Sequence, residues 1–235
     1  MQTPTVTELL LSPILAADPA GPRITYYDDS TGERIELSAV TLANWAAKTA
    51  NLLRDEFGLS PGGVVAVGLP AHWQTAAVLL GAWWAGAEVV LGGDSEADVA
   101  LVTAAGVESA VADEVVALSL DAFGKPVPDL SVAVTDYATS VRVHGDQFVP
   151  TGTGSAALDG IPVEDLMSAA RDGAEQRSWS PTDRILSTME WASTGDLVDG
   201  LLSVLAAGAS LVQVTNMDES ARARRIVNEK VTVTL

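Results

Sequence analysis

The sequence contains no cysteine and only two histidines. The lack of cysteine excludes disulfides, thiol nucleophiles and cysteine-ligated zinc. A Ser-His-Asp hydrolase could draw only on His72 or His144, and no Gly-x-Ser-x-Gly segment is present to position its serine. His72 follows a strand, where active sites do occur, but we interpret both histidines as surface or helix-start residues.

Basic residues are also scarce. Lysine and arginine total 13 against 31 acidic residues, which gives a formal net charge of −18. Such a field repels polyanions, so nucleic acid and anionic membrane surfaces are poor partners. The sequence has no apolar run long enough to span a bilayer, and no basic region precedes its first short apolar stretch. We therefore expect a cytoplasmic protein.

Apolar residues, in contrast, make up 48% of the 235 residues, enough for a substantial core. In the first half, predicted helices alternate with short apolar strands. Ser38 is a candidate N-cap for the first of these helices, Gly58 a candidate stop, and Asp94 a candidate cap of the third. The predicted elements are a hairpin at 24–27 and 34–37, helices at 38–57, 73–85 and 94–105, and strands at 64–67, 88–91 and 109–112.

The second half repeats this order. Each half has a Ser-Pro turn, Ser60-Pro61 or Ser180-Pro181, and an Ala-Gly-Ala stop after its central helix. We infer two similar lobes related by duplication, although short α/β units can reuse the same turns by chance. The predicted helices are 162–176, 196–206 and 218–229, and the strands are 184–187, 211–214 and 231–235.

This pattern predicts an α/β fold of two packed lobes, with mainly parallel sheets and helices on both faces. The predicted boundaries are 1–125 for the first lobe with its N-terminal hairpin, 126–160 for an irregular connection, and 161–235 for the second lobe. The connection includes a predicted strand near 131–134. Trp83 and Trp84 are predicted to pack in the core, or one of them to face a neighbouring lobe or subunit.

Several stretches, taken in their order and spacing, resemble the adenylate-forming (AMP-binding) superfamily of acyl-CoA synthetases and peptide-synthetase adenylation domains. The resemblance implies the fold of the N-terminal subdomains of those enzymes. The matching stretches are Ala43-Asn44, Leu52-Leu53, the run from Gly58 to Val67, Leu69-Pro70, Ala85-Gly86-Ala87, the run from Trp179 to Leu186, and the run from Leu201 to Val214.

The resemblance does not extend to the family's catalytic motifs. The family's phosphate loop, rich in Gly, Ser and Thr, ends in Pro-Lys-Gly, and its amides and lysine hold phosphate. When the segment 151–161 is aligned on Gly160, the lysine position holds Asp159 and the proline position Leu158. An aspartate repels phosphate. In a second family motif Trp191 keeps the aromatic residue, but Ala192 stands in the histidine position.

The family's adenine-binding motif, ribose-binding aspartate and lid lysine would all lie beyond Leu235. We therefore predict no catalytic residue, no metal and no cofactor. The favoured hypothesis is a non-catalytic interaction or scaffold module, as a homodimer or with a protein partner. The alternative is a protein that binds a nucleotide or acyl compound, or a residual enzyme, with a cleft between the lobes. The candidate binding residues, a degenerate phosphate loop and pocket, are Thr151, Gly152, Thr153, Gly154, Ser155 and Trp191.

Two further readings of the residues are weaker. The segment Gly152 to Ala157 loosely fits a dinucleotide fingerprint, but prolines flank it and no strand is predicted before it. The acidic clusters Asp28-Asp29 and Asp94 to Asp98 lack the spacing of a calcium loop.

Overall fold

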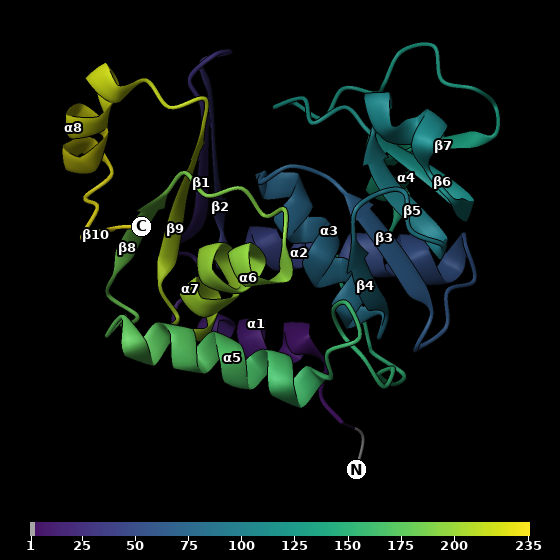
Figure 1. Ribbon diagram of the computed structural model, residues 1–235, viewed down its shortest axis with the longest axis horizontal. Helices are drawn as coiled ribbons and strands as arrows, with labels where there is room; N and C mark the ends of the chain where they lie inside the picture. Colours follow the sequence, from purple (N-terminus) through teal and green to yellow (C-terminus); the bar gives the residue numbers. More distant parts are fainter. Residues whose placement is uncertain (1–2) are drawn as a thin grey trace.

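The computed structural model describes residues 3–235, which form two five-stranded sheets with helices around and between them (Figure 1). Sheet A has the strand order β10-β8-β9-β1-β2, and sheet B has the order β4-β3-β5-β6-β7. Every strand pair is parallel except β1 with β2. The predicted α/β class with mainly parallel sheets is confirmed.

The strands of sheet A are β1 (Pro22–Asp28), β2 (Glu33–Ser38), β8 (Arg184–Ser187), β9 (Ser210–Thr215) and β10 (Val233–Thr234). The strands of sheet B are β3 (Val64–Gly68), β4 (Glu88–Leu91), β5 (Ala97–Thr103), β6 (Ala112–Leu118) and β7 (Val134–Asp136). The longer helices are α1 (Val6–Ala17), α2 (Ala39–Asp55), α3 (Trp73–Trp84), α5 (Val163–Gln176) and α8 (Glu219–Asn228). The remaining turns of helix are η1 (Ala104–Ser109), α4 (Tyr137–Ser140), η2 (Val141–Val143), α6 (Thr194–Leu197), the π-helix η3 (Val198–Leu202) and α7 (Ser203–Ala206).

Helices α2 and α3 lie between the two sheets (Figure 1). Helix α3 contacts β1 of sheet A and β4 of sheet B, which explains why it is apolar on all sides and why only Trp84 in it is not fully buried. Trp83 packs in the core, as predicted, while the ring of Trp84 faces Phe148 at 6.1 Å. On the far face of sheet A, Ile226 of α8 packs against buried strand residues. No helix among residues 3–235 is both long and apolar enough to cross a bilayer.

Local signals placed most helix ends correctly. Ser38 caps α2 through a hydrogen bond from the Thr41 amide, and Asp218 caps α8 through the Ser220 amide. Helix α1, which the sequence analysis did not predict, begins with a capping box formed by Thr5 and Glu8.

The predicted helix over 94–105 is wrong. Residues Ala97–Thr103 form β5, which lies between β3 and β6 in the middle of sheet B. Its central residues are buried on both faces, so the strand is a short continuous apolar run, which periodicity cannot distinguish from a helix. Asp94 therefore caps no helix, and Asp98 instead accepts a hydrogen bond from the Val64 amide at 2.7 Å.

Three further segments differ from prediction. The hairpin that the sequence analysis grouped with the first lobe pairs with sheet A, because β1 lies parallel to β9. The strand expected at 109–112 is β6, which starts only at Ala112. The strand expected near 131–134 starts at Val134 and is β7 at the edge of sheet B.

The two halves share their central topology. In sheet B, β3 lies between β4 and β5; in sheet A, β8 lies between β9 and β10. Equivalent backbone hydrogen bonds close the two Ser-Pro turns, from Gly63 to Ser60 and from Asp183 to Ser180. Gly86 and Gly208 both adopt positive φ, 82° and 71°, where each central helix ends. Common descent of the two units stays a prediction.

Candidate functional site

The segment 151–161, which the sequence analysis compared with the family's phosphate loop, adds to the free edge of β4. The Val89 amide donates to the Ala157 carbonyl at 2.9 Å, and the Asp159 amide donates to the Val89 carbonyl at 2.9 Å. The indole of buried Trp83 also donates to the Ala157 carbonyl, at 2.8 Å. These bonds hold residues 157–159 as an edge segment of sheet B.

The glycine-rich part of the segment packs against backbone at the amino ends of β3 and β4. The Gly154 amide donates to the Gly86 carbonyl at 3.1 Å, and the Gly62 amide donates to the same oxygen at 2.8 Å. A Cβ at Gly86 would lie 2.3 Å from the Gly152 carbonyl oxygen. The gap between Thr153-Gly154 and the core beneath them is too narrow to hold a water molecule. The loop is therefore tightly docked at this face.

Asp159, in the family's lysine position, is bonded at both carboxylate oxygens. Oδ1 accepts from the Leu91 amide at 3.0 Å, and Oδ2 accepts from the Thr194 hydroxyl at 2.5 Å. The side chain thus links the end of β4 to the start of α6. Asp159 therefore joins two segments that lie far apart in the sequence.

Trp191 packs beside the π-helix η3. It is 4% exposed, and its Nε1 lies 2.9 Å from where a Cβ on Gly200 would be. The Gly-rich part of the loop contacts the turns at Gly62 and Gly86. Whether either group binds a ligand stays a prediction.

A different cavity, of about 770 Å³, lies where the carboxyl ends of strands from both sheets meet, and we call it the inter-sheet cleft. Its size is typical of small-molecule sites. In parallel α/β folds, ligands bind beyond the carboxyl ends of the strands, as here. The cleft is lined by Tyr26, Asp28, the turn residues 31–35, Pro70, His72, Ser119 to Phe123, Lys125 and Thr215.

His72 and Glu33 form the buried polar base of the cleft. His72 caps α3: its Nδ1 accepts from the Gln74 amide at 3.1 Å, so the ring proton is assigned to Nε2. Nε2 lies 3.6 Å from Glu33 Oε1, and both atoms are buried without a hydrogen-bond partner. The Tyr26 ring packs edge-on against the imidazole at 4.3 Å. With Nδ1 occupied by a backbone amide, His72 is not free to act as a general base.

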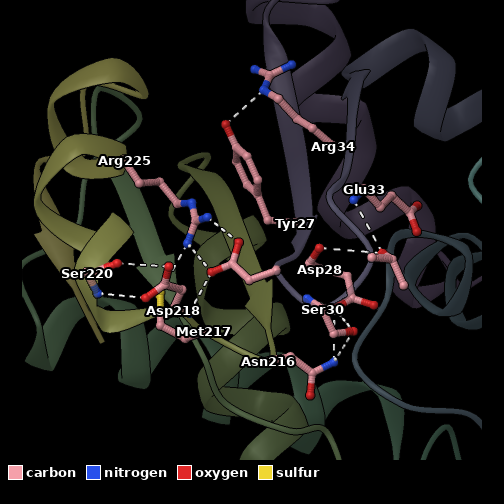
Figure 2. Close-up of polar contacts among 12 residues, drawn as sticks. Tyr27, Asp28, Ser30, Glu33, Arg34, Asn216, Met217, Asp218, Ser220 and Arg225 are labelled. Atoms are coloured by element: carbon pink, nitrogen blue, oxygen red, sulfur yellow. Dashed lines mark hydrogen bonds and ion pairs between the residues drawn. The ribbon is translucent and has the colours of Figure 1, made fainter.

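The turn between β1 and β2 forms one wall of the cleft and is fixed by polar bonds to the segment before α8 (Figure 2). Asp28 accepts from the Ser30 amide and from Asn216 Nδ2, both at 2.9 Å. Burial opposes ionisation of Asp28, but these hydrogen bonds outweigh it and hold the pKa of Asp28 below its usual range. Asp29 forms an ion pair with Arg225.

These bonds account for the Asp28-Asp29 cluster as a structural feature. Within residues 3–235, no group of three or more His, Asp or Glu side chains is arranged to hold a metal ion.

The opposite wall is the loop after β6, which carries the cleft's exposed groups. Asp121 accepts from the Phe123 amide at 2.9 Å, and Lys125 Nζ lies 3.7 Å from the Asp121 carboxylate. The Phe123 side chain is 80% exposed at the rim. Sequence reasoning missed this wall because it lies in the segment after β6, for which no element was predicted.

No model of a protein family matches the chain. A protein of Mycobacterium tuberculosis (strain ATCC 25618 / H37Rv), named "TIGR03089 family protein", is 59% identical over 241 residues, which cover 99% of each chain.

Solved structures of CoA ligases share the fold. An acyl-CoA synthetase of Brucella canis matches 98% of this chain with a TM-score of 0.77 and 18% identity. An anthranilate CoA ligase in complex with anthranoyl-AMP matches 100% of this chain with a TM-score of 0.77 and 14% identity. A benzoate CoA ligase of Burkholderia xenovorans matches 99% of this chain with a TM-score of 0.76 and 17% identity. The chain spans about half of those proteins, 47%, 50% and 50% of their lengths. Its fold is that of the N-terminal part of acyl-CoA ligases.

Proposed function

This chain belongs to the TIGR03089 family, and from that premise we propose that it is a small-molecule-binding protein that does not itself form adenylates. The ligand occupies the inter-sheet cleft. The observation that carries the proposal is this cleft of about 770 Å³, with the atoms Glu33 Oε1 and His72 Nε2 buried at its base without a hydrogen bond. Buried polar atoms without partners are rare in proteins and mark places where a ligand or bound water completes the bonding.

The lining indicates an organic ligand with polar and apolar parts. Phe123, Leu120 and Ile35 offer apolar surface, while Lys125 and the carboxylates of Glu33 and Asp121 offer both signs of charge. A nucleotide or an acyl compound has this mixed character, which agrees with the alternative raised from the sequence.

The absence of adenylation is supported by the segment 151–161. Its Gly-rich part is docked on the turn at Gly86, and Asp159 places a carboxylate where phosphate binding needs a cation. On this proposal the chain is a non-adenylating relative of the N-terminal half of an acyl-CoA ligase, and neither the segment 151–155 nor Trp191 contributes to binding.

Thermal shift followed by calorimetry tests the binding. The panel comprises ATP, AMP, CoA, acyl-CoA and aromatic and aliphatic carboxylates. A saturable rise in melting temperature that Phe123→Ala weakens supports the cleft. Val143→Ala is the matched control, because its side chain is also 80% exposed but lies outside the cleft. No shift with any compound, or equal shifts in both variants, contradicts binding in the cleft.

A second assay tests the chemistry. The chain is mixed with ATP, magnesium and the carboxylate panel, and pyrophosphate is measured. We expect none above a blank; release above the blank contradicts the non-adenylating part of the proposal.

A role as an interaction module is the second candidate. Apolar side chains in the segment 123–149 face solvent: Phe123, Val132, Val143 and Val149. Such exposed groups are typical of protein contacts when they cluster. Light scattering after size exclusion tests self-association: a dimer that Val143→Asp dissociates supports it, and a monomer at all concentrations removes the homodimer.

A further inference from the structure

Arg23, the second residue of β1, is a buried cation without an acidic partner. Its side chain is 5% exposed. Nη1 donates to the carbonyls of Gly208 at 2.5 Å and Ala209 at 2.7 Å, just after α7 ends. Across residues 3–235, no carboxylate oxygen lies within 4.0 Å of its guanidinium nitrogens.

Other deeply placed arginines are paired. Arg225 forms an ion pair with Asp29, and Arg184 forms one with Glu229 at 2.6 Å. Burial lowers the pKa of Arg23, and the charge of nearby Asp18 offsets this only in part. Buried charges in proteins are normally paired or coordinated, so Arg23 is the exception in a chain rich in acids.

The rest of the guanidinium has capacity to bind. Nε is buried and has no acceptor. Nη2 donates to no group in the part of the chain that the structure describes, and it is not among the buried unpartnered atoms, so it reaches solvent. Nε and Nη2 are the adjacent pair through which arginine binds a carboxylate with two hydrogen bonds.

An apolar groove of about 350 Å³ adjoins this cation. One wall is α1 and the other is the end of α7. Asp18, Arg23 and Pro181 line both this groove and a polar pocket of about 480 Å³, so Arg23 lies where apolar and polar surfaces meet. The groove is lined by Leu9, Leu10, Pro13, Ile14, Ala17, Asp18, Arg23, Pro181 and the residues 205–208.

The groove is distinct from the inter-sheet cleft. Arg23 lies at the amino end of β1, and Pro181 and Gly208 precede β8 and β9, whereas the cleft lies at the carboxyl ends of the strands. A ligand in one site does not touch the residues that line the other.

We propose that this groove binds an aliphatic monocarboxylate of medium chain length, with the chain between α1 and α7 and the carboxylate on the guanidinium of Arg23. Charge complementarity selects the anion, and the leucine, isoleucine and proline side chains select an alkyl chain over a polar one. Asp18 is exposed and accepts from the Gly21 amide at 2.9 Å, so it stays solvated beside the site and disfavours a second negative charge on the ligand.

The test measures octanoate binding to the whole protein chain by calorimetry. Octanol probes the alkyl chain without the charge, and acetate probes the charge without a long alkyl chain. We expect saturable octanoate binding, and binding at least tenfold weaker for octanol and for the Arg23→Met variant, because a charged hydrogen bond is lost. Ala17→Leu fills the groove mouth at an exposed position and should also abolish binding. Ala169→Leu, at an exposed position on α5, is its matched control and should bind as wild type.

Phe123→Ala separates this site from the cleft, and octanoate binding should survive it. Ala17→Leu keeps the proposal testable if Arg23→Met does not fold. Absence of saturable octanoate binding overturns the proposal, as does equal binding of octanol or undiminished binding by Ala17→Leu. Loss of octanoate binding in Phe123→Ala would place the ligand in the cleft and overturn the proposal as well.

Discussion

Replacing Glu229 with glutamine should weaken the attachment of α8 to sheet A. Glu229 is the C-cap of α8, and its side chain is 7% exposed. It accepts hydrogen bonds from the Tyr27 hydroxyl, from Arg184 Nη2 at 2.6 Å and from Arg34 Nε at 3.1 Å. Removing one member of a buried ion pair costs about 3–5 kcal/mol.

The cost here should fall below that range. Glu36 also forms ion pairs with Arg34 at 2.9 Å and with Arg184 at 3.3 Å, so each guanidinium group keeps one carboxylate partner after the substitution. Glutamine also keeps one acceptor oxygen. We therefore expect Glu229→Gln to cost about 2–3 kcal/mol at pH 7, which corresponds to a melting temperature lower by roughly 5–10 °C for a chain of this size.

The pH dependence gives a second signature. Burial opposes ionisation of Glu229, but its hydrogen bonds outweigh it and keep its pKa in the folded state below the usual range. A lowered pKa contributes stability that is present above the pKa of the unfolded chain and is lost as the pH falls through the folded pKa. The difference between wild type and Glu229→Gln should therefore be full at pH 7 and shrink below about pH 4.

Urea unfolding followed by circular dichroism and by tryptophan fluorescence measures both effects. Glu219→Gln on the same helix is the matched control, because Glu219 is 72% exposed and pairs only with Arg222. Its cost should stay below about 0.5 kcal/mol. Equal costs for the two variants at pH 7, or a Glu229→Gln cost that does not change in acid, would refute this reasoning.

Two further predictions concern the docked segment 151–161. Gly86→Ala should lower the free energy of unfolding in urea by at least about 2–3 kcal/mol, because Gly86 has a positive φ and its new Cβ would lie 2.3 Å from the Gly152 carbonyl oxygen. Gly32→Ala is the control. Gly32 also has a positive φ, 78°, but no neighbour within 4 Å, so this change should cost only about 1 kcal/mol. Equal costs would mean that the segment is not packed there in solution. Asp159→Ala should cost about 1 kcal/mol in the same assay, because the side chain's hydrogen bonds to β4 and α6 are lost. The Asp159→Lys variant should release no pyrophosphate from ATP. Release would show that the charge of Asp159 alone prevents adenylation.

Features set by neighbouring residues could be predicted from the sequence. Ser38 and Asp218 cap helices as predicted, because capping depends on a few consecutive residues. The resemblance to adenylate-forming enzymes also predicted the fold correctly. Strand β5 could not be identified, because its short apolar run also suits a buried helix and only its position between β3 and β6 makes it a strand.

The candidate site was less accessible from the sequence. The sequence drew attention to Asp159 through the resemblance, but its bonds to Leu91 and Thr194 depend on how distant segments meet. Glu33 was not considered, because nothing in its local sequence places it 3.6 Å from His72. Arg23 shows no sequence signal either, since its importance lies in the absence of an acid close enough to form an ion pair with it.

The strand order of sheet A has a consequence for how the molecule assembles. Strand β1 pairs with β9, so the residues near 25 have no parallel neighbour until the residues near 212 have been synthesised. Sheet B, in contrast, is contained between Val64 and Asp136. During synthesis sheet B can form first, while the β1–β2 hairpin stays exposed on the nascent chain until β8 and β9 emerge. The groove beside Arg23 needs Gly208, and the inter-sheet cleft needs Thr215, so neither cavity is complete until synthesis has passed these residues.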